Sequence, residues 1–344
     1  MEDAMKTVLE EVLGHYPVPV RKVSPVHDKG KKAVWLVRTG EGDAYLKKLS
    51  VRPPRAAFVA AATRHLRSRG AAVPDIIPAA GGRDWVEHGG FCYFLYRPVW
   101  GRKPRYNRRD MPSLMQSLGR FHRASVGFQP PDGAEHRSLL GAWPAIYRKK
   151  RQKMEQFKAA ALKMSDGFSR AFVQHAGPFI DRMEDVAARL ESSAYGDWCL
   201  RAAGDGTLCH QDYAAENLRI DGYGQVHVFD MDAVVCDLPA RDLRKMFNKV
   251  MKRRTWELSR AVDMMRWYHR ANPLTPQEWE VALLDMEFPH LLYGIADKRF
   301  TGRGAPGWTL ETFRSRLLAV IRMETSKNGV LPEIRSRLAG LLGW

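Results

Sequence analysis

The spacing of apolar and polar residues separates a β-rich beginning from a mainly helical remainder. Apolar residues recur at helical spacing over residues 4–14, which predicts a first helix. Apolar and polar positions then alternate over residues 33–37 and 43–49, as expected for strands with one buried face. Thr39-Gly40-Glu41-Gly42 lies between these two segments, so we expect a hairpin that turns at these residues.

The next segment predicts one helix followed by more strands. Two prolines open a helix over residues 53–69, and Gly70 closes it. Short apolar runs predict strands near 76–79, 85–86 and 91–96.

Beyond residue 102 the apolar residues recur mostly at helical spacing. Short strand-like runs interrupt this pattern at 207–232. One helix face is marked by Leu114, Leu118 and Phe121. Further helices are predicted over 143–162, 168–192, 240–254, 256–271, 276–296, 309–324 and 334–344.

Length and charge narrow the classes of partner. The 344 residues, of which 45% are hydrophobic, are enough for two packed lobes. The net charge of +17 favours acidic partners, which could be acidic proteins, polyphosphorylated ligands or nucleic acid. No nucleic-acid-binding module accompanies the charge, so nucleic acid is not the expected partner. The basic residues cluster within 97–109, 148–153 and 244–254, and each cluster taken singly is typical of a solvated face.

The cysteines and the start of the chain exclude several other classes. None of the four cysteines forms a Cys-x-x-Cys pair, so neither a zinc site nor a redox motif is indicated. The first residues lack the apolar core of a signal peptide, and no apolar run approaches membrane-spanning length. We therefore expect cytoplasmic synthesis without export, and no membrane partner.

One motif indicates chemistry. His210 and Asp212 form a His-x-Asp triplet, Asn217 follows five residues later, and Asp230 comes directly after an apolar strand that ends at Phe229. Phosphoryl transfer needs a carboxylate that orients the acceptor hydroxyl and oxygen ligands that hold Mg²⁺ against the ATP phosphates. Asp212 fits the first task, while Asn217 and Asp230 fit the second. The alternative is structural: Asp212 caps a turn, Asn217 supports the same loop, and Asp230 ends a strand.

A kinase of this type also needs a lysine on a strand of its β-rich part. Ala44-Tyr45-Leu46-Lys47 resembles the Val-Ala-Ile-Lys pattern, so Lys47 is the predicted ATP-binding lysine and Lys48 the alternative. Side chains alternate along a strand, so only one of the two can face the site. The structural alternative is a pair of surface lysines on an exposed hairpin.

Two parts of the usual kinase pattern are missing. No Asp or Glu occurs between Ser50 and Pro74, so the predicted helix offers Lys47 no carboxylate. The segment between Val18 and Val34 contains one glycine, Gly30, where several would let backbone amides approach phosphates. Lysines beside this glycine could contact phosphate instead, as less directional charges.

Several stretches of the chain together resemble the CotS family of bacterial spore coat proteins, within the aminoglycoside and choline phosphotransferase-like group. The resemblance extends from about residue 5 to residue 325. It is carried by Leu118–Phe128, Trp143–Tyr147, Leu208–Tyr213, Phe229–Asp232 and Asp237–Lys245.

The resemblance implies an α+β, bilobal, protein-kinase-like fold. The small β-rich lobe would span residues 1–97, the large mainly helical lobe residues 98–344, and residues 97–102 would connect them. ATP and Mg²⁺ are the implied cofactors, with Asp212 as base, Asn217 and Asp230 as metal ligands, and Asp232 assisting them. The implied location is the endospore coat, after synthesis in the mother cell, with other coat proteins as partners.

Two functions remain open from the sequence. The first is an enzyme that transfers the ATP γ-phosphate to a small molecule or coat component. The second is a catalytically weak or inactive pseudokinase that serves as a structural component of the coat. The motif favours the first function, and the absent helix carboxylate and single-glycine loop favour the second. The acceptor is not encoded in any motif.

Overall fold

The structure, a computed structural model, describes residues 2–28, 30, 32–135, 137–252 and 255–343. Two of the lysines beside Gly30, Lys29 and Lys31, lie outside the described residues, as do Arg253 and Arg254 of the basic cluster within 244–254. The chain divides into two compact units. The first comprises Met1–Ser138 and Asp205–Cys236, and the second comprises Leu139–Gly204 and Asp237–Trp344. The predicted lobe boundary at residues 97 and 98 is a different division and stays a prediction.

The first unit is built on an antiparallel sheet of six strands. The order is β1-β2-β3-β6-β4, and β5 also pairs with β6. The strands span Val20–Asp28 (β1), Ala33–Thr39 (β2), Gly42–Leu49 (β3), Ile76–Ile77 (β4), Val86–His88 (β5) and Phe91–Tyr96 (β6). The predicted strand regions are therefore confirmed, with ends that differ by a few residues.

Strand β1 lies in the segment between Val18 and Val34, for which the sequence pattern predicts a loop. Every position of β1 is exposed or half-buried, so it lacks the alternation that reveals a half-buried strand. It lies at the edge of the sheet and contains Pro25. Proline has no N–H to donate to a neighbouring strand, so within sheets it occurs mainly in edge strands such as this one.

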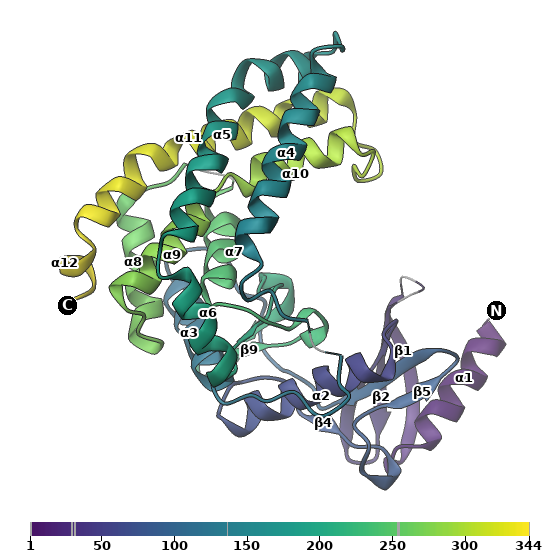
Figure 1. The fold of residues 1–344 in the computed structure, drawn as a ribbon. Helices are drawn as coiled ribbons and strands as arrows, with labels where there is room; N and C mark the ends of the chain where they lie inside the picture. The colour runs from purple at the N-terminus through teal and green to yellow at the C-terminus, as the bar shows by residue number, and fades with distance from the viewer. Residues whose placement is uncertain (1, 29, 31, 136, 253–254, 344) are drawn as a thin grey trace. The chain divides into compact units, whose positions relative to one another are not determined.

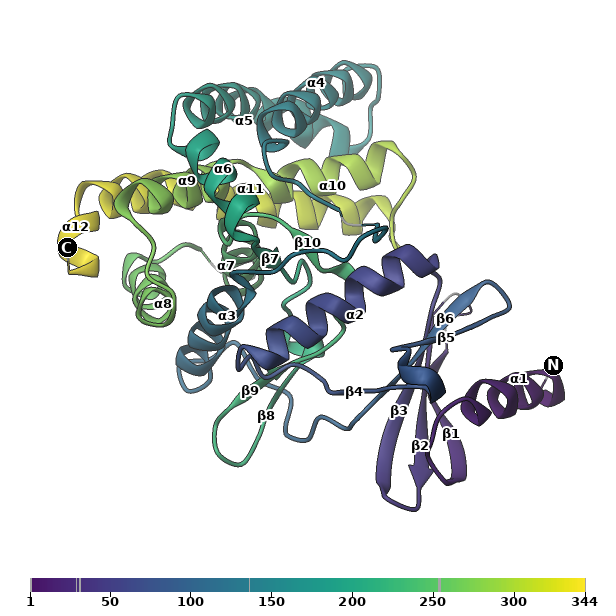
Figure 2. The ribbon, with the colours of Figure 1, turned by 60° about the horizontal axis from the view of Figure 1, so that its bottom comes forward.

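The two faces of the sheet are covered by different helices. Val12 and Leu13 of helix α1 (Glu2–Gly14) pack with Trp35 and Leu46 in one apolar cluster. Helix α2 (Pro53–Ser68) covers the other face (Figure 2). Its alanines pack against Phe94. Lys47 lies directly opposite Phe94 in the β3–β6 register, so both side chains project toward the face covered by α2. The sheet therefore places Lys47 beside α2.

The rest of the first unit contains helix α3 and the short strands that carry the motif. Helix α3 spans Met111–Ser125, and the strands are β7 (Leu208–Cys209), β8 (Leu218–Ile220), β9 (Val226–Val228) and β10 (Val235–Cys236). Single 3₁₀ turns occupy Ala80–Gly82 (η1), Ala215–Asn217 (η2) and Met231–Ala233 (η3). The segment after β6 is tied to this part by mutual backbone hydrogen bonds between Arg102 and Ile220. Gly101 allows the approach, since its φ is +134° and a Cβ there would lie 2.5 Å from the carbonyl oxygen of Ile220.

The second unit is helical. The long helices α4 and α5 lie side by side, with α10 and α11 next to them (Figure 1). The helices span Trp143–Ala161 (α4), Gly167–Glu191 (α5), Tyr195–Asp205 (α6), Ala240–Met251 (α7), Leu258–Ala271 (α8), Pro276–Glu287 (α9), His290–Phe300 (α10), Leu310–Ser336 (α11) and Leu338–Leu342 (α12). Within the described ranges, no helix combines the length and apolarity needed to cross a membrane.

Two helix predictions for this unit were wrong in part, and one helix was not predicted. The segment 276–296 is not one helix, because Phe288 and Pro289 separate α9 from α10 and proline disfavours helical backbone at the residue before it. Helix α11 does not end near residue 324 but continues to Ser336. The sequence pattern does not predict α6, because its two glycines weaken the helical signal.

A buried polar cluster stabilises the helices of the second unit. The carboxylate of Asp285 on α9 is fully buried and accepts hydrogen bonds from the Tyr147 hydroxyl and the Arg244 guanidinium. It also contacts Nε2 of His290 at 2.7 Å. Burial opposes the charge of Asp285, but Arg244 and His290 outweigh it and hold the pKa of Asp285 well below its usual range. Burial and the nearby charge of Arg244 lower the pKa of His290.

Candidate active site

Asp230 occupies an unusual backbone conformation at the end of β9. Its φ of +66° and ψ of +58° lie in the left-handed region. Within the described ranges, Gln211 is the other non-glycine residue with positive φ, and it directly precedes Asp212. Such conformations cost free energy in residues that carry a Cβ, and they concentrate at functional sites. The two turns of the predicted motif are therefore the places where the backbone is held away from its preferred conformations.

Asp212 and Asn217 are held together by local hydrogen bonds. The side-chain amide of Asn217 donates to Oδ2 of Asp212 at 2.9 Å and to the backbone oxygen of Asp212 at 3.0 Å. Because Nδ2 makes both bonds, Oδ1 of Asn217 is the amide atom left to bind a cation. The backbone oxygen of Asn217 accepts from the backbone N–H of Phe229 at 3.0 Å, so the residue before Asp230 is fixed beside Asn217.

His210 braces this loop. Its Nδ1 accepts the backbone N–H of Asp212 at 3.2 Å, and its Nε2 lies 3.0 Å from the carbonyl oxygen of Phe229. A carbonyl can only accept, so the proton must reside on Nε2 and the ring is neutral in this arrangement. His210 is completely buried. Its two hydrogen bonds therefore connect the loop before Asp212 to the end of the strand before Asp230.

Lys47 lies between two carboxylates. Its ammonium group forms ion pairs with Oδ1 of Asp230 and with Oδ1 of Asp232. Burial opposes ionisation of Asp230, but the charge and hydrogen bond of Lys47 outweigh burial and lower the pKa of Asp230. The neighbouring Lys48 instead places its ammonium group over the Phe91 ring, 3.8 Å from the centroid. Lys47, the first choice from the sequence, is thus the lysine that reaches the acidic residues.

A second lysine reaches the same acids from the single-glycine loop. Nζ of Lys32 lies 3.0 Å from Oδ2 of Asp232, although the Lys32 side chain remains 60% exposed. Burial would lower the pKa of Lys32, but the carboxylates of Asp232, Asp230 and Asp212 raise it overall. Gly30 in this loop has a φ of +69°, and its N–H donates to Asp28 at 2.7 Å. The β1–β2 loop therefore directs a cation, rather than a row of glycine amides, toward the acidic residues.

Arg55 of α2 lies beside these acidic residues, and the sequence pattern does not indicate it. Its buried guanidinium donates through Nη2 to the carbonyl oxygens of Asp232, at 2.9 Å, and Val234. Burial lowers the pKa of Arg55, as expected for a cation taken out of water. The only sequence signal was the absence of acids from this helix, and it gave no indication of which arginine would face inward.

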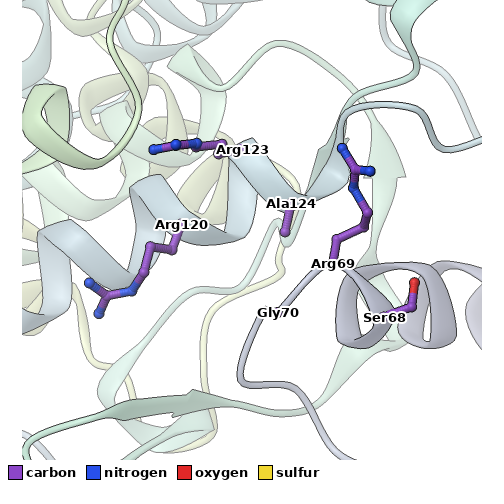
Figure 3. A pocket seen from close by; sticks show the side chains of 6 residues that line it. All are labelled: Ser68, Arg69, Gly70, Arg120, Arg123 and Ala124. Carbon is purple, nitrogen blue, oxygen red and sulfur yellow. The ribbon is translucent and has the colours of Figure 1, made fainter.

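The first unit also has a surface hollow of about 480 Å³, lined by residues from the end of α2 and from α3. None of the site residues described in this subsection lines it. Figure 3 shows the side chains of Arg120 and Arg123 leaving α3 and that of Arg69 leaving the end of α2. The lining residues are Ser68, Arg69, Gly70, Arg120, Arg123 and Ala124, so the hollow has basic but no acidic side chains.

Comparison with known proteins identifies the family. The model of the phosphotransferase enzyme family matches residues 22–282. Spore coat protein S of Bacillus subtilis (strain 168) is 30% identical over 330 residues, which is 95% of this chain and 93% of that protein. The chain belongs to the CotS family, within the phosphotransferase enzyme family. The family resemblance seen in the sequence is thereby confirmed.

Solved structures confirm the fold of this CotS family member. The aminoglycoside phosphotransferase from Alicyclobacillus acidocaldarius subsp. acidocaldarius matches with a TM-score of 0.80 and 16% identity, over 96% of each chain. A spectinomycin phosphotransferase in complex with ADP and spectinomycin matches with a TM-score of 0.60 and 12% identity, over 94% of this chain and 98% of that one. The predicted α+β kinase-like fold is therefore confirmed.

Proposed function

We propose that this CotS family member is an ATP-dependent phosphotransferase that transfers the γ-phosphate to a hydroxyl or amine of a small molecule or coat component. The observation that carries the proposal is the pairing of Lys47 with Asp230 and Asp232, next to the loop that joins Asp212 to Asn217. These are the cation, the oxygen ligands and the base that phosphoryl transfer requires. The ADP complex of the spectinomycin phosphotransferase supports a nucleotide as the ligand.

In this proposal Asp212 receives the proton of the acceptor hydroxyl. The amide of Asn217 donates to Oδ2 of Asp212 and thereby fixes the orientation of this carboxylate. Lys47 contacts the ATP phosphates, and its pairing with two carboxylates restricts its position before nucleotide arrives. Catalysis of this reaction depends mainly on such positioning and on charge.

The oxygen donors in the site fit Mg²⁺. Carboxylate and amide oxygens are the protein ligands that this ion prefers, and Asp230 and Asn217 provide both kinds. Asp230 is the more exposed of the two acids beside Lys47, with 34% of its side chain accessible against 8% for Asp232. When bound, Mg²⁺ supplies positive charge that offsets the charge on the phosphates.

One of the two arguments for the alternative, an inactive scaffold, does not hold in the structure. This alternative rested partly on the absence of a carboxylate partner for Lys47 in the following helix, yet Asp230 and Asp232 provide such partners. A thermal-shift titration with MgATP tests the proposal, because a ligand at 100 times its Kd adds about 2.7 kcal/mol to the free energy of unfolding. An unchanged melting temperature at millimolar MgATP would favour the scaffold.

We expect Asp230→Ala to remove the Mg²⁺ dependence of ATP binding. The measurement is the ratio of ATP affinities in Mg²⁺ and in EDTA, obtained by calorimetry. This ratio should fall toward one, since the variant lacks the exposed carboxylate of the proposed metal site. Asp197→Ala removes an exposed acid of the second unit and should leave the ratio unchanged. An unaltered ratio in Asp230→Ala would exclude Asp230 as a metal ligand.

The proposed location is the endospore coat, after synthesis in the cytoplasm of the mother cell, and the proposed partners are coat proteins with acidic segments. The support is the name of the Bacillus subtilis relative together with the net charge of +17. The hollow lined by Arg69, Arg120 and Arg123 offers one basic surface to such a segment.

We expect Arg69→Gln with Arg120→Gln to weaken binding of poly-L-glutamate by about three- to tenfold, since each exposed ion pair contributes at most about 1 kcal/mol. Binding should also weaken from 50 to 500 mM salt, because salt screens exposed charges. Arg38→Gln with Arg83→Gln removes the same charge from the sheet side of this unit and serves as the control. Equal losses in both double variants would indicate a diffuse charge effect without a preferred surface.

A further inference from the structure

Helix α2 has the opposite charge from the one that this kinase position usually carries. In protein kinases, a glutamate of the helix after the lysine strand pairs with the lysine. Here α2 has no acidic residue, and the segment between Ser50 and Pro74 has none either. The carboxylates that hold Lys47 come instead from the loop after β9. The negative charge beside Lys47 therefore comes from the turn that begins at Asp230, and not from helix α2.

The two acids of this turn are not equivalent. Asp232 is nearly buried, and its two carboxylate oxygens are each taken by a lysine: Oδ1 by Lys47 and Oδ2 by Lys32. Asp230 is four times more exposed, and the ion pair with Lys47 engages its Oδ1. Asp232 is therefore better suited to hold ammonium groups, and Asp230 to hold a cation that arrives with the substrate.

Arg55 connects this turn to α2. One guanidinium nitrogen donates to the carbonyl oxygens of both Asp232 and Val234, which lie on either side of the end of the turn. Only 7% of Arg55 is exposed, so it cannot exchange these bonds for water without moving. The backbone that carries Asp232 is thereby fixed to the helix, although no acidic side chain extends from the helix itself.

From these contacts we infer that Asp232 is the carboxylate that positions Lys47 for nucleotide binding, and that Arg55 of α2 holds Asp232 in place. Arg55 and Asp232 together position Lys47, which is the role that the helix glutamate has in protein kinases. This inference rests on the proposed nucleotide site, and it assigns Asp232 to Lys47 where the sequence predicted a metal ligand. Both residues act through Lys47, so both are positioning residues.

A double-mutant cycle on nucleotide affinity tests the inference. ADP binding is measured in Mg²⁺ and in EDTA for wild type, Lys47→Met, Asp232→Asn and the double variant. We expect Asp232→Asn to weaken binding by roughly tenfold in both buffers and by less than twofold when Lys47 is already Met, as for residues that act through one contact. An effect of Asp232→Asn confined to the Mg²⁺ buffer, or one unchanged in the Lys47→Met background, overturns the inference.

The role of Arg55 is tested in the same assay. Arg55→Gln should reproduce the loss seen in Asp232→Asn, and Arg55→Lys should recover part of it because a cation remains near the two carbonyls. The control is Arg52→Gln, which removes an arginine three residues earlier whose side chain is 79% exposed and pairs with Glu135. Equal effects of Arg55→Gln and Arg52→Gln would contradict the inference. Circular dichroism melts verify that each variant is folded.

A second measurement needs no nucleotide. Brief labelling with acetic anhydride followed by mass spectrometry reports how freely each lysine amine reacts. Lys47 should react several times faster in Asp232→Asn and in Arg55→Gln than in wild type, while Lys48, which packs on Phe91, should not change. If wild type binds no nucleotide but these rates change as expected, the proposed function fails and the positioning contact stands. Unchanged labelling of Lys47 in both variants overturns the contact itself.

Discussion

Replacing Asp212 by asparagine is expected to lower phosphotransfer by at least about 100-fold, since a general base contributes roughly 10²–10⁴ to such a rate. The variant keeps the shape of the side chain, and its Oδ1 can still accept the hydrogen bond from the Asn217 amide. What it loses is the ability to take the proton of the acceptor. The free energy of unfolding should change little, because the brace of His210 on this loop uses the backbone N–H of residue 212.

The measurement is transfer of labelled γ-phosphate from ATP, first to water and then to a panel of amino alcohols, amino sugars and coat-protein fractions. Thermal melting is recorded in parallel. Asp197→Asn is the matched control, since it makes the same chemical change at an exposed position of α6. Residual transfer that does not respond to Asp212→Asn would mean that another group takes the proton. A melting temperature that falls together with activity would indicate a structural role instead.

The local half of the site could be predicted from the sequence. Asp212 and Asn217 are five residues apart, and the hydrogen bonds that join them form within one loop. The sequence could not decide fully between Lys47 and Lys48. Side chains alternate along a strand, so only one of the two lysines can face the site, but alternation does not show which of them it is. The β3–β6 register, which places Lys47 opposite Phe94 beneath α2, decides between them.

The remainder could not be predicted, because it depends on contacts between distant segments. Arg55 reaches the carbonyl oxygen of Val234, and Lys32 reaches Asp232 across 200 positions of sequence. No periodicity in α2 distinguishes Arg55 from the other arginines of that helix. Strand β1 was missed for a related reason: it is held mainly by backbone pairing with β2, and its side chains do not alternate between buried and exposed positions.

The largest effect on stability is expected from Asp285→Ala in the second unit. Removing this carboxylate leaves the buried guanidinium of Arg244 without its partner and deprives the Tyr147 hydroxyl of its acceptor. Removing one member of a buried ion pair typically costs about 3–5 kcal/mol, because the remaining charge stays out of water. We therefore expect a loss of this size in the free energy of unfolding, measured by urea denaturation.

Two further variants show whether the cost arises from the uncompensated charge. Asp185→Ala removes an aspartate that is 56% exposed and pairs with Arg189 on the surface of α5, and it should cost less than about 1 kcal/mol. Asp285→Leu combined with Arg244→Met removes both buried charges and should recover much of the stability lost in Asp285→Ala. A cost of Asp285→Ala no larger than that of Asp185→Ala would contradict this interpretation of the cluster.

The same cluster predicts how stability depends on pH. The pKa of Asp285 is held well below its unfolded value of about 4, so the folded state binds fewer protons than the unfolded state as the pH falls through that value. The stabilisation from Asp285 is therefore complete above about pH 5 and declines progressively below pH 4. The difference in unfolding free energy between wild type and Asp285→Ala should be constant from pH 8 to pH 5 and shrink from pH 4 to pH 2. A difference that stays constant down to pH 2 would mean that the pKa of Asp285 is the same in the folded and unfolded states, and that Arg244 and His290 do not stabilise its charge.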